Sequence, residues 1–170
     1  MNNSNQPDVI IFMTDEERAI PPYETPEVIE WRDRTLAGRN WFKENGVSFN
    51  RHYTGSLACV PSRPTLFTGQ FPDVHGVTQT NGLGKDEHDS RMRWLLPREV
   101  PTIGHWFRAA GYDTHYDGKW HISHADLVDE DTGNALATNT ADGTVLQDAV
   151  DRYLVENPLN EFGFSGWVGP

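Results

Sequence analysis

The sequence contains a single cysteine, Cys59, among its 170 residues. A lone cysteine cannot form a disulfide within the chain, so Cys59 is buried as a small apolar residue, chemically reactive, or modified. Basic residues are also scarce: 14 Lys and Arg stand against 25 Asp and Glu, which gives a net charge of −11. Nucleic acids and anionic membranes are recognised by clustered basic residues, so neither is an expected partner.

Long hydrophobic runs are absent as well. The apolar run Val9–Met13 is too short for the core of a signal peptide or for a membrane span, and the residues before it are polar. We therefore expect a cytoplasmic protein. No internal repeat or interdomain linker is visible, and 170 residues are enough for one domain with a buried core.

Strand and helix patterns alternate along the chain. The run Val9–Met13 is typical of a strand buried on both faces, and residues 46–53 alternate apolar and polar side chains as a strand does. This order of elements predicts an α/β protein with a mostly parallel central sheet flanked by helices. In full, we predict strand 9–13, a helical segment from Thr25 to Gly46 broken near Gly38, strand 46–53, a helix from Cys59, helix 101–111, strand 114–116 and a helix over 145–154.

The segment Cys-Val-Pro-Ser-Arg that begins at Cys59 predicts the first turn of a short helix. Pro61 suits such a turn, Ser62 can cap exposed backbone N–H groups, and Gly69 ends the helix. Cys59 would then lie at the helix N-terminus, where partial positive charge stabilises a thiolate and favours a bound anion, with Arg63 one turn away. On composition alone, a small buried apolar cysteine is the commoner case.

This segment, followed by Leu-Phe-Thr-Gly at residues 66–69, resembles the signature of the type I sulfatases of the alkaline phosphatase superfamily. In that family a separate enzyme converts the Cys to formylglycine, whose hydrate is the nucleophile. Residues 7–16 resemble the family's first strand, which ends in acidic metal ligands, and residues 111–121 resemble the segment that delivers a catalytic Lys and His. The resemblance covers roughly residues 7 to 125 and implies an alkaline-phosphatase-like fold.

The resemblance implies a catalytic role for four side chains. One hydroxyl of hydrated formylglycine at position 59 would attack sulfur, and the second would then be deprotonated and expel sulfate. Arg63 would hold the hydrated aldehyde through its rigid fork of donors. Lys119 would bind the sulfate together with residue 59, and His121 would hold the second hydroxyl and help to remove its proton.

The resemblance also implies a metal site formed by Asp15, Glu16 and residue 59. Adjacent carboxylates repel one another unless a cation or a proton lies between them. Oxygen ligands suit Ca²⁺, with Mg²⁺ or Mn²⁺ as alternatives, and the ion would polarise the nucleophile and neutralise the sulfate oxygens. The common family pattern has two Asp residues here, so Glu16 is a departure that leaves the metal preference open.

Complete sulfatases are several hundred residues long, and their remaining metal ligands, with a further Lys and His, come from later sequence. We therefore expect residues 1–170 to be the N-terminal part of a single sulfatase catalytic domain, inactive without the rest of the chain. The expected function is hydrolysis of a small organic sulfate ester, with the formylglycine-generating enzyme as a partner. The alternatives are a phosphonate monoester or phosphodiester hydrolase of the same superfamily and, in another class, a non-catalytic fragment or redox-sensitive thiol protein.

Overall fold

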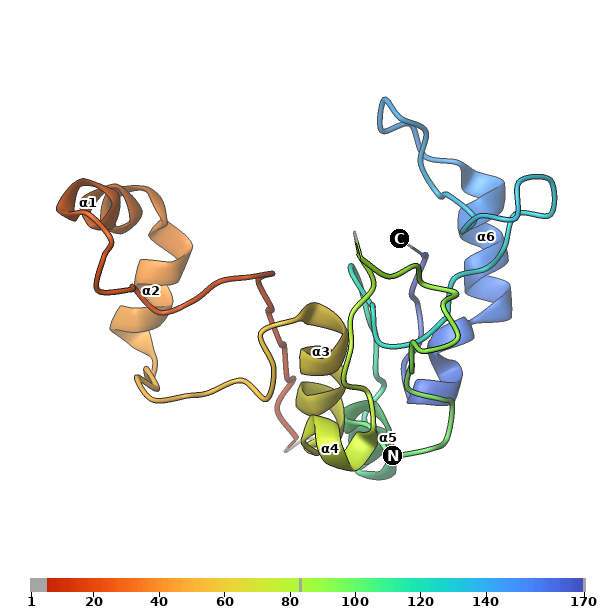
Figure 1. Ribbon diagram of the computed structural model, residues 1–170, viewed down its shortest axis with the longest axis horizontal. Coiled ribbons are helices and arrows are strands. Elements are labelled where there is room, and N and C mark those ends of the chain that lie inside the picture. The colour runs from red at the N-terminus through yellow and green to blue at the C-terminus, as the bar shows by residue number, and fades with distance from the viewer. Residues whose placement is uncertain (1–5, 83, 170) are drawn as a thin grey trace. The chain divides into compact units, whose positions relative to one another are not determined.

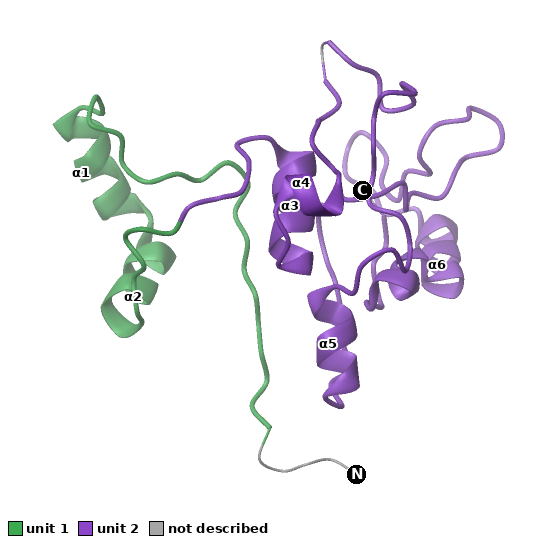
Figure 2. Ribbon diagram, turned by 60° about the horizontal axis from the view of Figure 1, so that its bottom comes forward, with its two compact units in different colours: residues 1–52 green, residues 53–170 purple. Residues whose placement is uncertain are grey.

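The computed structural model describes residues 6–82 and 84–169 (Figure 1). The chain divides into two compact units, residues 1–52 and residues 53–170 (Figure 2). Helices α1 and α2 belong to the first unit, and helices α3 to α6 with a short 3-10 helix belong to the second. Among the described residues, no helix is both long enough and apolar enough to cross a membrane.

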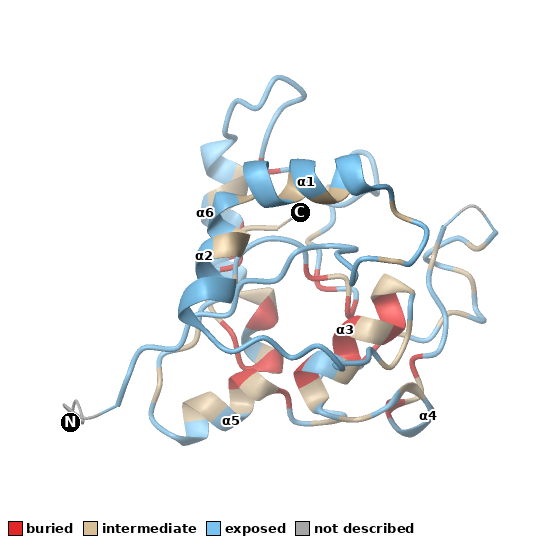
Figure 3. Ribbon diagram, turned by 90° about the vertical axis from the view of Figure 1, so that its left-hand side faces the viewer, coloured by how far each residue is buried: buried red, intermediate tan, exposed pale blue. Residues whose placement is uncertain are grey.

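The first unit contains the predicted helical segment as two helices, α1 (Pro26–Thr35) and α2 (Ala37–Asn45). Pro26 occupies the first position of α1, as the sequence predicts. The break lies at Leu36, two residues before the predicted position at Gly38, because Leu36 leaves helical geometry with φ −89° and ψ 64°. Neither helix buries a side chain, and Figure 3 shows both as mostly exposed with some half-buried positions.

The predicted strands 9–13 and 46–53 are not strands in the described structure. All five side chains of Val9–Met13 are exposed, with Phe12 at 79% and Ile10 at 74%. An isolated strand leaves its backbone N–H and C=O groups without ladder partners, so an apolar run becomes a strand only where other strands pair with it. No segment among residues 6–82 and 84–169 pairs with either run, so the predicted parallel sheet is not confirmed.

In place of a sheet, the described residues form isolated β-bridges. The predicted strand 114–116 is reduced to one parallel bridge between His115 and Ser165. Its hydrogen bonds run from Ser165 N to Thr114 O at 2.9 Å and from Tyr116 N to Ser165 O at 3.0 Å. The bridge ties the segment that leads to Lys119 to the C-terminal part of the second unit. The antiparallel bridges are Gly82 with Lys85, Val128 with Ala135 and Asn139 with Val145.

Helix α3 (Cys59–Thr68) is confirmed with the predicted start and end. Gly69 ends it in the left-handed conformation, with φ +71°, which glycine adopts without steric cost. The predicted cap by Ser62 is wrong: Ala58 is the N-cap residue and no side chain caps the helix. The Ser62 hydroxyl lies 2.9 Å from the Thr54 hydroxyl instead. This hydrogen bond uses the hydroxyl group that would be needed for capping.

An aromatic cluster packs α3 against the segment around residue 120. The Phe67 ring centroid lies 5.5 Å from that of Trp120, 5.7 Å from that of Phe164 and 5.8 Å from that of Tyr116. Tilted and edge-on pairs at these separations add stabilisation to the burial of the rings. Buried apolar side chains of the second unit form one core: Val60, Phe67, Val77, Leu95, Trp120, Ile122, Ala125, Tyr153, Leu159, Phe162, Phe164 and Trp167.

Three further helices and a 3-10 helix complete the second unit: α4 (Pro72–His75), α5 (Ile103–Ala109), α6 (Gln147–Glu156) and η1 (Pro158–Phe162). The helices predicted at 101–111 and 145–154 are therefore confirmed with shifted ends. A capping box between Thr102 and His105 starts α5. Gly104 on this helix is buried, and a Cβ there would lie 2.6 Å from the Gly163 carbonyl oxygen. The sequence thus needs glycine at position 104 for close packing.

Candidate functional site

Cys59 and Lys119 are brought together within the second unit. Cys59 is the first residue of α3 and is half-buried, and its Sγ lies 3.6 Å from the Nζ atom of Lys119. The ammonium group and the N-terminus of a ten-residue helix both favour negative charge at this position. The site therefore suits an anion bound beside residue 59.

Arg63, one turn after Cys59 on α3, is buried with 6% of its surface exposed. Its Nη1 atom donates to the backbone carbonyls of Lys119 and Trp120, the second at 3.3 Å, and to the Tyr116 hydroxyl at 3.3 Å. A guanidinium has no acceptor capacity and is always charged, so carbonyl oxygens are suitable partners for it inside the protein. These bonds hold the loop that bears Lys119 against the helix that begins with Cys59.

The Tyr116 hydroxyl completes this arrangement. It accepts from Arg63 and donates to the Lys119 carbonyl at 2.6 Å. Burial raises the pKa of Tyr116, and the nearby Arg63 charge opposes that shift to a smaller degree. Tyr116 therefore stays protonated and serves as a donor. The sequence did not indicate this role, because the resemblance over residues 111–121 assigns roles only to Lys119 and His121.

His121 lies in the same loop with an unusual backbone. Its φ is +51°, in the left-handed region that residues with a Cβ rarely adopt, and Gly118 before it has φ +82°. Such strained positions collect at functional sites, where surrounding contacts hold them. The ring of His121 is held on one side by Asn81, whose Oδ1 lies 2.8 Å from Nε2, and the Trp94 ring lies 5.7 Å away.

The predicted metal ligands Asp15 and Glu16 belong to the other unit, residues 1–52. Both are exposed, and Glu16 has φ +59°, which turns the chain directly after Asp15. Two successive exposed carboxylates offer hard oxygen ligands of the kind that Ca²⁺ and Mg²⁺ take. The donor set therefore fits a divalent cation, and its role as a metal site with residue 59 stays a prediction.

The comparison with protein-family models decides the family. A model described as Sulfatase matches residues 7–161, most of the chain. This chain belongs to the sulfatase family. Membership implies the alkaline-phosphatase-like fold that the sequence motifs also indicate. The four residues for which the family motifs predict a catalytic role all belong to the second unit of the sulfatase chain: Cys59, Arg63, Lys119 and His121.

Curated relatives of this sulfatase chain match parts of it. An uncharacterized sulfatase, YidJ, of Escherichia coli (strain K12) is 36% identical over 78 residues, 45% of this chain and 13% of the relative. The N-acetylglucosamine-6-sulfatase of Homo sapiens is 28% identical over 118 residues, 69% of this chain and 19% of the relative. The N-acetylgalactosamine-6-sulfatase of Mus musculus is 29% identical over 105 residues, 61% of this chain and 18% of the relative.

The chain spans less than a fifth of the length of each of these relatives. No solved structure matches it at a significant level. The family assignment therefore rests on the family model and on the curated sulfatases, not on a solved fold.

A hollow elsewhere on the sulfatase chain is separate from these residues. It has a volume of about 610 Å³ and is lined by residues of α5, of the 111–115 segment and of the C-terminal part, including Arg108, Tyr112, His115 and Ser165. Arg108 already donates to Thr114, Asn160 and Ser165. None of the predicted site residues lines this hollow, so it does not contribute to the candidate site.

Proposed function

We propose that this chain is the N-terminal part of the catalytic domain of a longer sulfatase, which hydrolyses a sulfate monoester through formylglycine made from Cys59. The observation that supports this most is the Lys119 ammonium group, 3.6 Å from the Cys59 Sγ at the start of α3. This contact brings together the segment that begins at Cys59 and the segment 111–121, which resemble two separate motifs of the family. The family model matches residues 7–161.

A sulfate monoester is a poor electrophile shielded by negative oxygens, so its hydrolysis needs a strong nucleophile, neutralisation of negative charge and a proton donor for the leaving oxygen. Formylglycine supplies the nucleophile when the cysteine has been converted. Lys119 binds a sulfate oxygen beside residue 59, and the N-terminal N–H groups of α3 favour the same negative charge. The positive charge of Arg63 would favour negative charge on the hydroxyls of residue 59. Arg63 also keeps the Lys119 loop in place.

We further propose that Asp15, Glu16 and residue 59 hold a divalent cation, with Ca²⁺ first and Mg²⁺ or Mn²⁺ as alternatives. The support is the chemistry of the two successive carboxylates and the family pattern at this position. The ion would polarise the nucleophile and neutralise sulfate oxygens. We also propose that strands 9–13, 46–53 and 114–116 pair in one parallel sheet in the complete enzyme, since each run is typical of a strand.

Intact mass of the full-length protein tests the modification. Co-expression with a formylglycine-generating enzyme should lower the mass of the chain by about 18 Da, and Cys59→Ala should abolish that change. A thiol at Cys59 that stays unmodified and reacts with alkylating agents would contradict the formylglycine proposal and favour a redox-sensitive thiol protein.

Turnover of two matched esters tests the reaction. The converted full-length enzyme should hydrolyse an aryl sulfate faster than the corresponding aryl phosphonate, and Cys59→Ala should lose the activity while keeping the wild-type melting temperature. Faster turnover of the phosphonate would assign the chain to the phosphonate monoester hydrolases of the same superfamily instead.

A further inference from the structure

Asn81 makes a direct hydrogen bond to the ring of His121. The Asn81 Oδ1 atom lies 2.8 Å from Nε2 of His121, and both side chains are half-buried. An amide oxygen only accepts hydrogen bonds, so Nε2 must bear the proton of this bond. In a neutral imidazole the proton sits on one nitrogen, and Nδ1 is then the acceptor.

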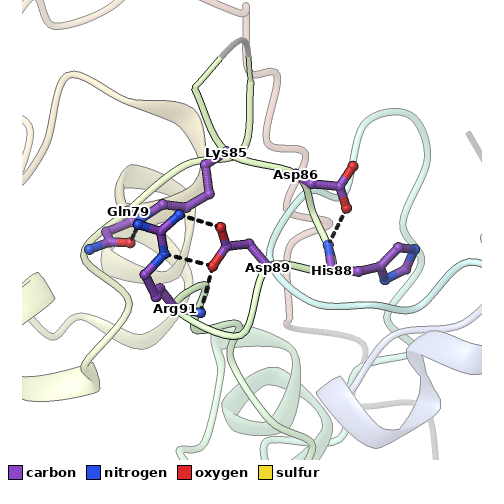
Figure 4. A network of polar contacts seen from close by, with 6 residues as sticks. All are labelled: Gln79, Lys85, Asp86, His88, Asp89 and Arg91. Atoms are coloured by element: carbon purple, nitrogen blue, oxygen red, sulfur yellow. Dashed lines mark hydrogen bonds and ion pairs between the residues drawn. The ribbon is translucent and has the colours of Figure 1, made fainter.

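The segment that contains Asn81 is held in place by its own polar contacts. Gly82 and Lys85 pair through two backbone bonds, of 2.9 and 3.1 Å, and the Lys85 ammonium donates to Gln79. Farther along, Asp89 accepts from Arg91 through the backbone N–H and the guanidinium, at 2.6 to 2.9 Å (Figure 4). These bonds hold the pKa of Asp89 well below its usual range, so the pair is charged at neutral pH.

Trp94 links the same segment to the His121 loop. Its ring lies 5.7 Å from the His121 ring, and its Nε1 atom donates to the Glu87 carbonyl at 3.2 Å. The next residue, Leu95, is buried and donates its backbone N–H to the Ile122 carbonyl at 3.1 Å. Trp94 and Leu95 are therefore anchored at His121 and Ile122.

We propose that Asn81 is a positioning residue for the sulfatase reaction: it fixes His121 as the tautomer protonated on Nε2 and so makes Nδ1 the proton acceptor. This inference rests on the proposed function, in which His121 removes a proton from a hydroxyl of residue 59. Nδ1 takes that proton while the C–O bond to the departing sulfate breaks and its electron pair leaves with the sulfate. Trp94 limits the rotation of the His121 ring. The hydrogen bond from Nε2 to Asn81 and the orientation of Nδ1 are therefore both fixed.

The tautomer can be read directly from wild-type enzyme that has not been converted. In protein labelled with ¹⁵N-histidine at about pH 8, where an ordinary histidine is neutral, a long-range ¹H–¹⁵N spectrum separates protonated from unprotonated ring nitrogens. The His121 signals are those absent from His121→Gln. We expect protonation on Nε2. A His121 ring protonated on Nδ1 would overturn the proposal whether or not the protein is a sulfatase.

Two substitutions of Asn81 test the consequence for catalysis. Asn81→Leu keeps the size but removes the acceptor, and kcat for an aryl sulfate should fall about 10- to 100-fold, the usual cost of removing the outer partner of a functional histidine. Because the step that needs His121 follows release of the alcohol, KM should fall together with kcat, and a burst of released phenol should appear. Asn81→Asp keeps an acceptor oxygen and should retain the Nε2 tautomer and the absence of a burst.

The control is Asn134→Leu, which changes an exposed asparagine of the same unit and should leave kcat and KM unchanged. A wild-type enzyme without activity on sulfates would contradict the proposed function while the spectrum still decides the tautomer. An active wild type whose Asn81→Leu variant keeps kcat and the Nε2 tautomer would overturn the role of Asn81 alone.

Discussion

The guanidinium of Arg63 donates a hydrogen bond to the backbone carbonyl of Lys119, 56 positions farther along the chain. The Lys119 side chain reaches back to the Sγ of Cys59, four residues before Arg63 on the same helix. Through these two contacts the backbone of Lys119 holds the loop against α3, and its ammonium group lies beside the Sγ of Cys59. Different substitutions should separate these two roles.

Arg63→Met should destabilise the folded enzyme. The substitution keeps much of the side-chain volume but removes the charged donor to the Lys119 and Trp120 carbonyls, and the Tyr116 hydroxyl then remains as a donor to the Lys119 carbonyl alone. The expected loss is about 3 kcal/mol in the free energy of unfolding, measured by urea denaturation, because buried acceptors lose charged hydrogen bonds. Arg152→Ala, at an exposed position, should change stability by less than about 0.5 kcal/mol. Equal stability of the two variants would contradict the structural role of Arg63.

Lys119→Ala should remove activity and leave stability unchanged. The substitution deletes the ammonium group 3.6 Å from Sγ of Cys59 but keeps the carbonyl that Arg63 and Tyr116 use. We expect kcat/KM for an aryl sulfate to fall by about 100-fold or more, the size seen when one charge-stabilising donor is lost, with an unchanged melting temperature. Lys43→Ala, an exposed lysine of the first unit, is the matched control. Wild-type turnover in Lys119→Ala would rule out its role in sulfate binding.

His75 should make the stability of the second unit depend on pH. It is buried, its Nδ1 accepts from the Val77 N–H at 3.1 Å, and its Nε2 lies 3.1 Å from the Thr65 hydroxyl. Burial, and to a lesser degree the nearby charge of Arg93, lowers the pKa of His75 below its ordinary value of 6.5. Below that value the unfolded chain binds more protons at this position than the folded one, so stability rises with pH.

The stabilising contribution of neutral His75 is therefore complete above about pH 6.5 and is lost as the pH falls through the folded pKa. Urea midpoints of the wild type should decrease between about pH 7 and about pH 5, and His75→Gln should show a smaller decrease. His52→Gln replaces an exposed histidine and should keep the wild-type dependence. The same pH dependence in wild type and His75→Gln would contradict the assignment.

Helices were predictable wherever local features decide them. Thr25 precedes α1 and Pro26 begins it, Gly69 ends α3 in a left-handed conformation, and α6 ends before the Asn157-Pro158 pair. Helix hydrogen bonds connect residues four positions apart, so a local sequence contains most of the information. Strands are different because their partners lie far away, and the apolar run Val9–Met13 has the composition of a strand without a described partner.

The sequence by itself determined the family motifs, the start of α3 at Cys59 and the identity of the residues proposed for catalysis. It could not determine what Arg63 touches, that Tyr116 donates to the Lys119 carbonyl, or that Asn81 binds the ring of His121. These contacts join residues 3 to 57 positions apart, and most of them depend on how α3 and two loops pack in the second unit. The spacing of residues along the sequence predicts hydrogen bonds between near neighbours. A donor is placed beside an acceptor far away in the sequence only when the chain folds and the core packs.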